Sequence, residues 1–223
     1  MPLVLIFWGF LIFLFCYLLG SIPFSYLVAF LYGKNLYQIG SKNIGAANVW
    51  RATGKVEAFL MALIGDVGKG VLAMFLAGKF SESCFAPYLL YAQVIAAFSV
   101  ILGHNWPIYL KFKGGRGLAA LAGVIAFLNW KLIFIVLITI GFFIFLTELI
   151  MKKKIKVEGK FKEKIKGLFA IFISQVLGRM IGILASAILI FVFYPQIFKV
   201  LLPAAILSGI KHIKRTKEFL KKP

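Results

Sequence analysis

Seven apolar segments alternate with short polar segments, most of them basic, along the 223 residues of the chain. A membrane-spanning helix needs about 20 apolar residues, and most of the segments approach or exceed that length. Inside a bilayer an unpaired backbone group is costly, so such segments form helices. The pattern therefore predicts an all-α, polytopic membrane protein with about seven transmembrane helices. The segments are Leu3–Tyr32, Ala58–Ala77, Ala86–Leu102, Leu118–Leu128, Leu132–Met151, Leu168–Phe193 and Phe198–Ile210.

Some of these helices are expected to be short or broken. The sequence Gly20-Ser21-Ile22-Pro23 interrupts the first segment and predicts a kink or a partly unwound turn, because proline cannot donate a backbone hydrogen bond. The segments at 118–128 and 198–210 are short, and either is a candidate half-helix. We expect a single domain over residues 1–223, with motif loops at 33–57 and 103–117, a basic insertion at 152–166 and a basic tail at 211–223.

The composition narrows the class of protein further. Apolar residues make up 62% of the chain and charged residues only 15%. A soluble domain of average composition is about half apolar and a quarter charged. These values exclude a soluble enzyme, a disordered chain and a multidomain receptor, so any chemistry lies in the loops or between the helices.

The charge is strongly positive and unevenly placed. There are 26 Lys and Arg against 7 Asp and Glu, a net charge of +19. If the N-terminus is outside and the segments alternate, 21 of the basic residues fall in the cytoplasmic loops and tail, and only three on the other side. Cytoplasmic loops carry this excess in membrane proteins. We therefore expect a cytoplasmic C-terminus and contacts with anionic membrane lipids rather than with nucleic acid.

Two of the cytoplasmic loops have the composition of an anion site. The loop at 33–57 contains the glycine-rich run 40–48 and Arg51, and the loop at 103–117 contains His104, three cations and the run Gly114-Gly115-Arg116-Gly117. Glycine-rich turns can point backbone N–H groups inward, and such concavities hold phosphate together with fixed cations. An arginine adds a bidentate contact to phosphate. The alternative for each loop is a solvated turn whose charges only orient the protein.

Four motifs carry a resemblance to a known family. They are Gly-Ser-Ile-Pro-Phe at 20–24, Gly-Ser-x-Asn-Ile-Gly-Ala-x-Asn-Val-x-Arg at 40–51, Asp66-x-x-Lys69-Gly70, and Gly-His-x-x-Pro at 103–107 followed by Lys-Phe-x-Gly-Gly-Arg-Gly. Over about residues 10–125 the chain resembles the bacterial acyl-phosphate:glycerol-3-phosphate acyltransferases. The resemblance implies a multi-pass enzyme of the inner membrane that transfers a fatty acyl group from acyl phosphate to the 1-hydroxyl of glycerol 3-phosphate, the first acylation of phospholipid synthesis. It implies no metal and no cofactor.

The same resemblance assigns roles to individual residues. It implies that His104, Ser41 and Arg51 are catalytic, although a substrate phosphate is an alternative base to His104 and the one we favour. It implies a substrate-binding group made of Asn43, Asn48, Lys113, Arg116, Lys69, Asp66, His212 and Arg215. For Asp66 and Lys69, which lie three apart on one helical face, a purely structural ion pair is the open alternative.

The resemblance weakens toward the C-terminus. The family's third motif has a histidine and an asparagine where this chain has Gly209 and His212, while Arg215 matches. Two alternatives to the enzyme follow. One is a divergent relative that binds without turnover or acylates another acceptor, and the other is a small anion or lipid transporter with basic gates.

Overall fold

The computed structural model describes the backbone of residues 2–84, 88–150 and 177–220, and the side chains of residues 3–82, 88–150 and 178–212. The described backbone is helical and contains no strand. The α-helices are α1 (Pro2–Ser21), α2 (Phe24–Leu31), α3 (Ala46–Thr53), α4 (Val56–Cys84), α5 (Leu89–Asn105), α6 (Leu118–Asn129), α7 (Lys131–Ile150), α9 (Leu177–Phe193) and α10 (Pro195–Leu220). The predicted all-α fold class is therefore confirmed.

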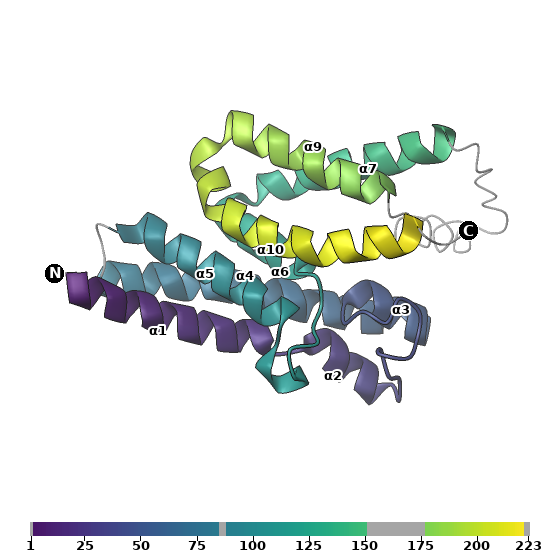
Figure 1. The fold of residues 1–223 in the computed structure, drawn as a ribbon, viewed down its shortest axis with the longest axis horizontal. Coiled ribbons are helices and arrows are strands. Elements are labelled where there is room, and N and C mark those ends of the chain that lie inside the picture. Colours follow the sequence, from purple (N-terminus) through teal and green to yellow (C-terminus); the bar gives the residue numbers. More distant parts are fainter. Residues whose placement is uncertain (1, 85–87, 151–176, 221–223) are drawn as a thin grey trace. The chain divides into compact units, whose positions relative to one another are not determined.

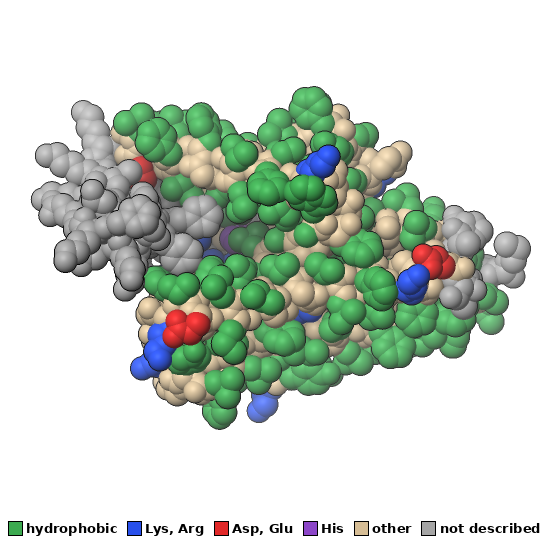
Figure 2. Space-filling view, turned by 180° about the vertical axis from the view of Figure 1, so that it is seen from behind, with side chains coloured by type: hydrophobic (Ala, Val, Ile, Leu, Met, Phe, Trp, Pro, Cys, Tyr) green, Lys and Arg blue, Asp and Glu red, His purple; other side chains and the backbone are tan. Residues whose placement is uncertain are grey.

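Four helical stretches are long and apolar enough to cross a membrane: Leu3–Leu31, Val56–Glu82, Leu89–Leu110 and Lys131–Ile150. Two shorter apolar helices, Leu118–Asn129 and Gly178–Phe193, accompany them. Apolar side chains cover most of the face shown in Figure 2, as expected of a surface that contacts lipid. The polytopic membrane architecture follows from these helices, while a total of seven crossings stays a prediction.

The chain forms two compact units, and the first contains residues 1–129 and 199–223. In this unit α1, α4 and α5 run side by side, and α6 packs on α4 (Figure 1). The backbones of α1 and α5 approach closely at two glycines, because a Cβ on Gly20 would overlap the Val100 backbone and a Cβ on Gly103 would overlap the Tyr17 carbonyl. Small residues permit this close packing between membrane helices.

The second unit contains residues 130–198, and in it α7 packs against α9. The predicted basic insertion at 152–166 lies outside the described residues. The helix α10 begins at Pro195 and continues to Leu220, so the predicted segment 198–210 is part of a longer helix that includes Pro203. A single domain over the whole chain stays a prediction.

The predicted break in the first apolar segment is confirmed. The helix α1 ends at Ser21 and α2 begins at Phe24, with Ile22 and Pro23 between them. The predicted loops are less simple than expected. The first contains the short helix α3, and His104, expected in the second loop, belongs to the last turn of α5.

Candidate active site

The two glycine-rich loops lie against each other in the first unit. The Tyr37 hydroxyl donates a hydrogen bond to the Lys113 carbonyl at 2.8 Å, which joins the first loop to the second. A Cβ on Gly115 would overlap the Ile44 carbonyl, so the two backbones touch there as well. The two loops that the sequence singled out for an anion site are thus in contact with each other.

Asn48 organises the first loop from inside. Its Oδ1 accepts a hydrogen bond from the Ser41 N–H at 2.9 Å, and its Nδ2 donates to the carbonyls of Leu36 at 3.2 Å and Ile39 at 3.1 Å. The side chain is only 1% exposed. Asn48 is predicted to bind substrate, and in the structure these hydrogen bonds are all with the backbone of its own loop. It holds the turn on which Ser41 sits.

His104 is buried rather than exposed to the loop. It is 7% exposed, and its carbonyl accepts a hydrogen bond from the Gly115 N–H at 3.0 Å. Its Nδ1 lies 3.6 Å from Asp66 Oδ1 on α4. A Cβ on Gly115 would overlap Nε2 of the ring as well as the Ile44 carbonyl. The imidazole therefore fills the space between α4 and the point where the two loops meet.

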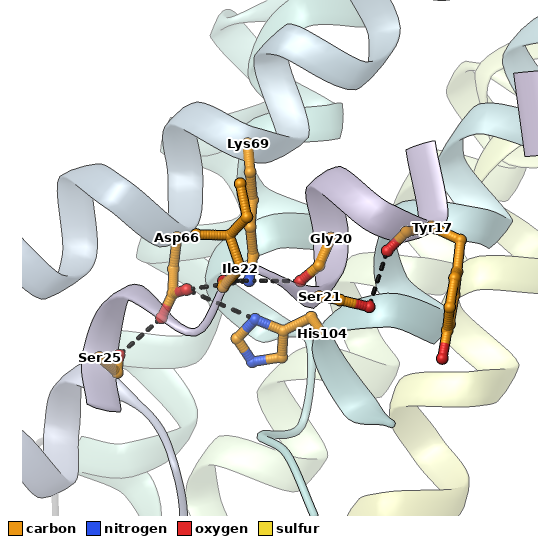
Figure 3. A network of polar contacts seen from close by, with 8 residues as sticks. All are labelled: Tyr17, Gly20, Ser21, Ile22, Ser25, Asp66, Lys69 and His104. Carbon is orange, nitrogen blue, oxygen red and sulfur yellow. Dashed lines mark hydrogen bonds and ion pairs between the residues drawn. The ribbon is translucent and has the colours of Figure 1, made fainter. Parts of the chain in front are cut away.

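Asp66 and Lys69 form a buried ion pair, with 1% and 3% of each residue exposed and 3.1 Å between Nζ and Oδ1. Lys69 Nζ also donates to the carbonyls of Gly20 at 2.8 Å and Ile22 at 3.0 Å (Figure 3). Two of the three ammonium hydrogens are thus donated to these carbonyls, and the Asp66 carboxylate is the partner in the ion pair. These contacts of Lys69 are all within the protein, as the structural alternative expects, and substrate binding by Lys69 is not tested by them.

A small cavity lies among these groups. Its lining includes Ser21, Ser25, Lys69, His104 and Gly115. The volume of about 10 Å³ corresponds to roughly one water molecule. This space is too small for a phosphate ester.

The outer surface of the loops carries the remaining loop residues of the expected site. Lys113 is exposed, while Ser41, Asn43, Arg51 and Arg116 are half-buried. Arg51 lies in the last turn of α3, whose N-terminus follows directly on the glycine-rich run. This surface combines guanidinium, ammonium, hydroxyl and amide groups, the donors that bind phosphate in proteins.

The helix α10 reaches the same region. Ser208 Oγ donates to the Arg116 carbonyl at 2.5 Å, and Asn105 Nδ2 donates to the Leu207 carbonyl at 3.1 Å. His212 Nδ1 lies 2.9 Å from the Ser208 carbonyl, and Lys211 Nζ lies 4.6 Å from the centre of the Trp106 ring. The C-terminal segment that aligns with the family's third motif thus contacts the second loop. The side chain of Arg215 lies outside the described residues.

Sequence reasoning missed several residues that hold this site together. Ser25, Tyr37 and Ser208 each make one of the connecting hydrogen bonds, to Asp66, Lys113 and Arg116 respectively. For Ser25 a signal was available, because a serine in the first turn after a break in an apolar helix is well placed to bond a buried partner. Tyr37 and Ser208 carry no such signal in the sequence.

The fold and these loops define a membrane-integral protein with two basic, glycine-rich loops in contact at the ends of its helices. The chain belongs to the glycerol-3-phosphate acyltransferase family, whose model matches residues 10–159. It is thereby an acyltransferase, and the transporter alternative is set aside.

Individual relatives support this assignment. The chain is 34% identical to the glycerol-3-phosphate acyltransferase of Wolbachia pipientis subsp. Culex pipiens (strain wPip), over 95% of this chain and 94% of that protein. It is 46% identical to the enzyme of the same name from Dinoroseobacter shibae, over 52% of this chain and 54% of that protein.

A solved structure shares the fold. It is the crystal structure of PlsY (YgiH), an integral membrane glycerol 3-phosphate acyltransferase, in its glycerol 3-phosphate form. The TM-score is 0.66 at 23% identity, covering 95% of this chain and 92% of that one. The lysophosphatidic acid form matches with a TM-score of 0.65. At this identity the match concerns the fold alone.

Proposed function

We propose that the protein transfers a fatty acyl group from acyl phosphate to the 1-hydroxyl of glycerol 3-phosphate, giving lysophosphatidate and inorganic phosphate in phospholipid synthesis. The single observation that carries the proposal is the contact of the two loops at Tyr37 and Lys113. It supports a shared surface to which the cationic and polar groups of both loops contribute. Both proposed substrates are phosphate anions, so both can use this surface.

The proposed reaction needs no covalent bond between the substrates and the protein. The 1-hydroxyl oxygen attacks the acyl carbonyl carbon, a new ester bond forms, and the bond between the acyl carbon and the phosphate oxygen breaks. Inorganic phosphate is a good leaving group, so positioning and charge stabilisation can supply the catalysis. Arg51, Arg116 and Lys113 are the proposed contacts to the two phosphate groups, and Ser41 and Asn43 the proposed neutral donors.

The hydroxyl proton needs an acceptor. A substrate phosphate has its second pKa near 6 and lies beside the attacking hydroxyl, so it can take the proton. His104 was the other candidate. Its burial and its position between α4 and the two loops favour the phosphate as base, and we assign His104 to positioning.

The proposed site faces the cytoplasm of a bacterial inner membrane. The argument is the distribution of charge, since the loops at 33–57 and 103–117 and the tail from 211 are all basic. This orientation places the N-terminus outside and the C-terminus in the cytoplasm, where glycerol 3-phosphate is available.

The test is an assay of the purified protein in detergent with acyl phosphate and labelled glycerol 3-phosphate. Labelled lysophosphatidate and inorganic phosphate should form in equal amounts, and acyl-CoA in place of acyl phosphate should give no product. If acyl-CoA gives product and acyl phosphate does not, the acyl donor is acyl-CoA and the proposed donor is wrong. Absence of product with both donors would support the non-catalytic relative instead.

A further inference from the structure

We propose that the buried Asp66–Lys69 pair is a clasp that positions both substrate loops for acyl transfer, and that neither residue contacts substrate. The inference rests on the proposed function and adds two positioning residues to it. The two side chains contact different ends of the break between α1 and α2, as Figure 3 shows. Each end leads to one of the loops.

Lys69 holds the end of α1. A helix end leaves carbonyls without intrahelical partners, and a cation near a C-terminus is favoured by the helix dipole. Lys69 Nζ donates to the carbonyls of Gly20 and Ile22, on either side of Ser21. The clasp therefore fixes the backbone at Ser21.

The end of α1 in turn holds the start of the second loop. Ser21 Oγ donates to the Tyr17 carbonyl at 2.8 Å and accepts from the Ile108 N–H at 3.4 Å. Tyr17 OH donates to the Trp106 carbonyl at 2.9 Å. A movement of Ser21 would be passed directly to residues 106–108, which lead to Lys113.

Asp66 holds the start of α2. Its Oδ2 accepts a hydrogen bond from Ser25 Oγ at 2.6 Å, in the first turn of that helix. Val28 of α2 belongs to the same hydrophobic cluster as Leu36 and Ile44 of the first loop. The Asp66 carboxylate therefore helps to fix the position of α2, and through α2 the position of the first loop that packs on it.

Asp66 also lies close to His104. The Nδ1 of His104 is 3.6 Å from Asp66 Oδ1, and the His104 carbonyl receives the Gly115 N–H at 3.0 Å. The ring touches the point where Gly115 meets Ile44. Asp66 thus contacts α2 through Ser25, and it contacts the junction of the two loops through His104.

Stability alone does not account for this arrangement. A buried ion pair costs much desolvation free energy, and replacing both partners by uncharged residues of similar size is often neutral or stabilising. Removing one partner is strongly destabilising, because it leaves an unpaired buried charge. This difference separates a positioning role from a purely structural one.

The experiment compares Asp66→Asn, Lys69→Met and the double variant, with thermal midpoints in detergent and kcat and KM for both substrates. Each single variant should lower the midpoint. The double variant should recover the part of the loss that comes from an unpaired buried charge, yet its kcat should stay about 10- to 100-fold below wild type, since small misplacements of reacting groups cost this much. Recovery of kcat together with the midpoint would overturn the clasp and leave a structural ion pair.

A matched control exists on the same helix. Lys79 and Glu82 form an ion pair with the same spacing, 2.9 Å apart, with side chains 60% and 68% exposed. Lys79→Met with Glu82→Gln should leave the midpoint and kcat unchanged. A loss of activity in this control as large as that of the clasp variant would also overturn the proposal.

A second variant decides the matter if the double variant does not fold. Ser25→Ala removes the bond from Asp66 to α2 and leaves both charges in place. It should lower kcat about 10-fold, the lower end of what one hydrogen bond to a charged group contributes, with a folded protein. An unchanged kcat would overturn the proposal. Wild-type protein inactive with both donors would overturn the proposed function and the clasp with it, whereas active wild type with an equally active double variant overturns the clasp alone.

Discussion

The hydroxyl of Tyr37 donates to the carbonyl of Lys113 at 2.8 Å and joins two loops that are 76 positions apart in the chain. Burial, and to a smaller extent the nearby Tyr26, raises the pKa of the Tyr37 phenol above its ordinary value. The phenol therefore keeps its proton, and remains a donor, throughout the neutral range. The contact depends on one neutral hydrogen bond, which makes it simple to test.

Tyr37→Phe removes this bond and keeps the ring. A neutral hydrogen bond contributes about 0.5–1.5 kcal/mol, so kcat/KM for glycerol 3-phosphate should fall about 2- to 10-fold. Steady-state kinetics measure the effect. Tyr109→Phe is the matched control, because Tyr109 is 58% exposed, and it should behave as wild type. If Tyr37→Phe has the same kcat/KM as Tyr109→Phe, the contact between the two loops is not needed for activity.

Arg51→Lys should lose most of the activity although it keeps the charge. A guanidinium forms two parallel hydrogen bonds to a phosphate, whereas an ammonium acts as a point charge. A charge-assisted hydrogen bond contributes about 1.5–3 kcal/mol, which corresponds to a drop of about 10- to 150-fold in kcat/KM. The yield of folded, membrane-inserted protein is the control. If that yield falls in parallel with activity, Arg51 has a structural role.

Gly115→Ala should disturb the junction of the loops. The added Cβ would overlap His104 Nε2 and the Ile44 carbonyl, so the backbone must shift. Overpacking of this kind costs about 1–3 kcal/mol, and we expect a lower thermal midpoint together with a lower kcat. Gly78→Ala on α4 is the control, because a Cβ there meets nothing within 4 Å. A Gly115→Ala protein with wild-type kcat would show that a backbone shift at the junction of the two loops does not affect catalysis.

The sequence predicts the helices of this fold well because lipid restricts the choice. Long apolar segments must form helices, and Pro23 marks the break because it cannot donate to the preceding turn. The short helix α3 is not predicted. It lies inside a run rich in Gly, Ser and Asn, which by composition favours turns. Only its end at Gly54, in a left-handed conformation with φ 67°, is a recognisable helix stop.

The roles of buried polar residues are the part that the sequence does not reveal. The spacing of Asp66 and Lys69 predicts that they pair, and they do. That Lys69 also binds the end of α1 depends on the packing of α1, α4 and α5, which no local pattern encodes. The same holds for Asn48, whose motif suggests a ligand while its contacts are with the loop backbone.

Cysteine labelling tests the predicted orientation of the loops. In this experiment Lys42→Cys and Lys113→Cys are reacted with a membrane-impermeant thiol reagent in intact cells and in inverted vesicles. Both positions are exposed, so accessibility is not limited by folding. Both should label only in inverted vesicles, because basic loops remain in the cytoplasm. Wild-type protein measures the background from Cys16 and Cys84, and labelling of either variant in intact cells would reverse the topology.

The C-terminal helix carries the last prediction. His212 Nδ1 contacts the Ser208 carbonyl at 2.9 Å, and Ser208 Oγ donates to the Arg116 carbonyl at 2.5 Å. A carbonyl oxygen can only accept, so Nδ1 carries the hydrogen in this contact. Ser208 thus connects His212 to the second loop, and His212 aligns with the asparagine of the family's third motif.

If the chain is an active enzyme, His212→Ala should raise KM for glycerol 3-phosphate about 2- to 10-fold, the value of one hydrogen bond. His212→Asn restores the family residue. Its KM for glycerol 3-phosphate should stay within about twofold of wild type. Ser208→Ala should shift KM in the same direction as His212→Ala. Unchanged kinetics in all three variants would make His212 one more polar residue of the basic tail.

The chain also has room to restore both residues of the family's third motif. A Cβ at Gly209 meets nothing within 4 Å, so Gly209→His can be combined with His212→Asn. Rescue of an inactive wild-type chain by that pair would identify a decayed enzyme.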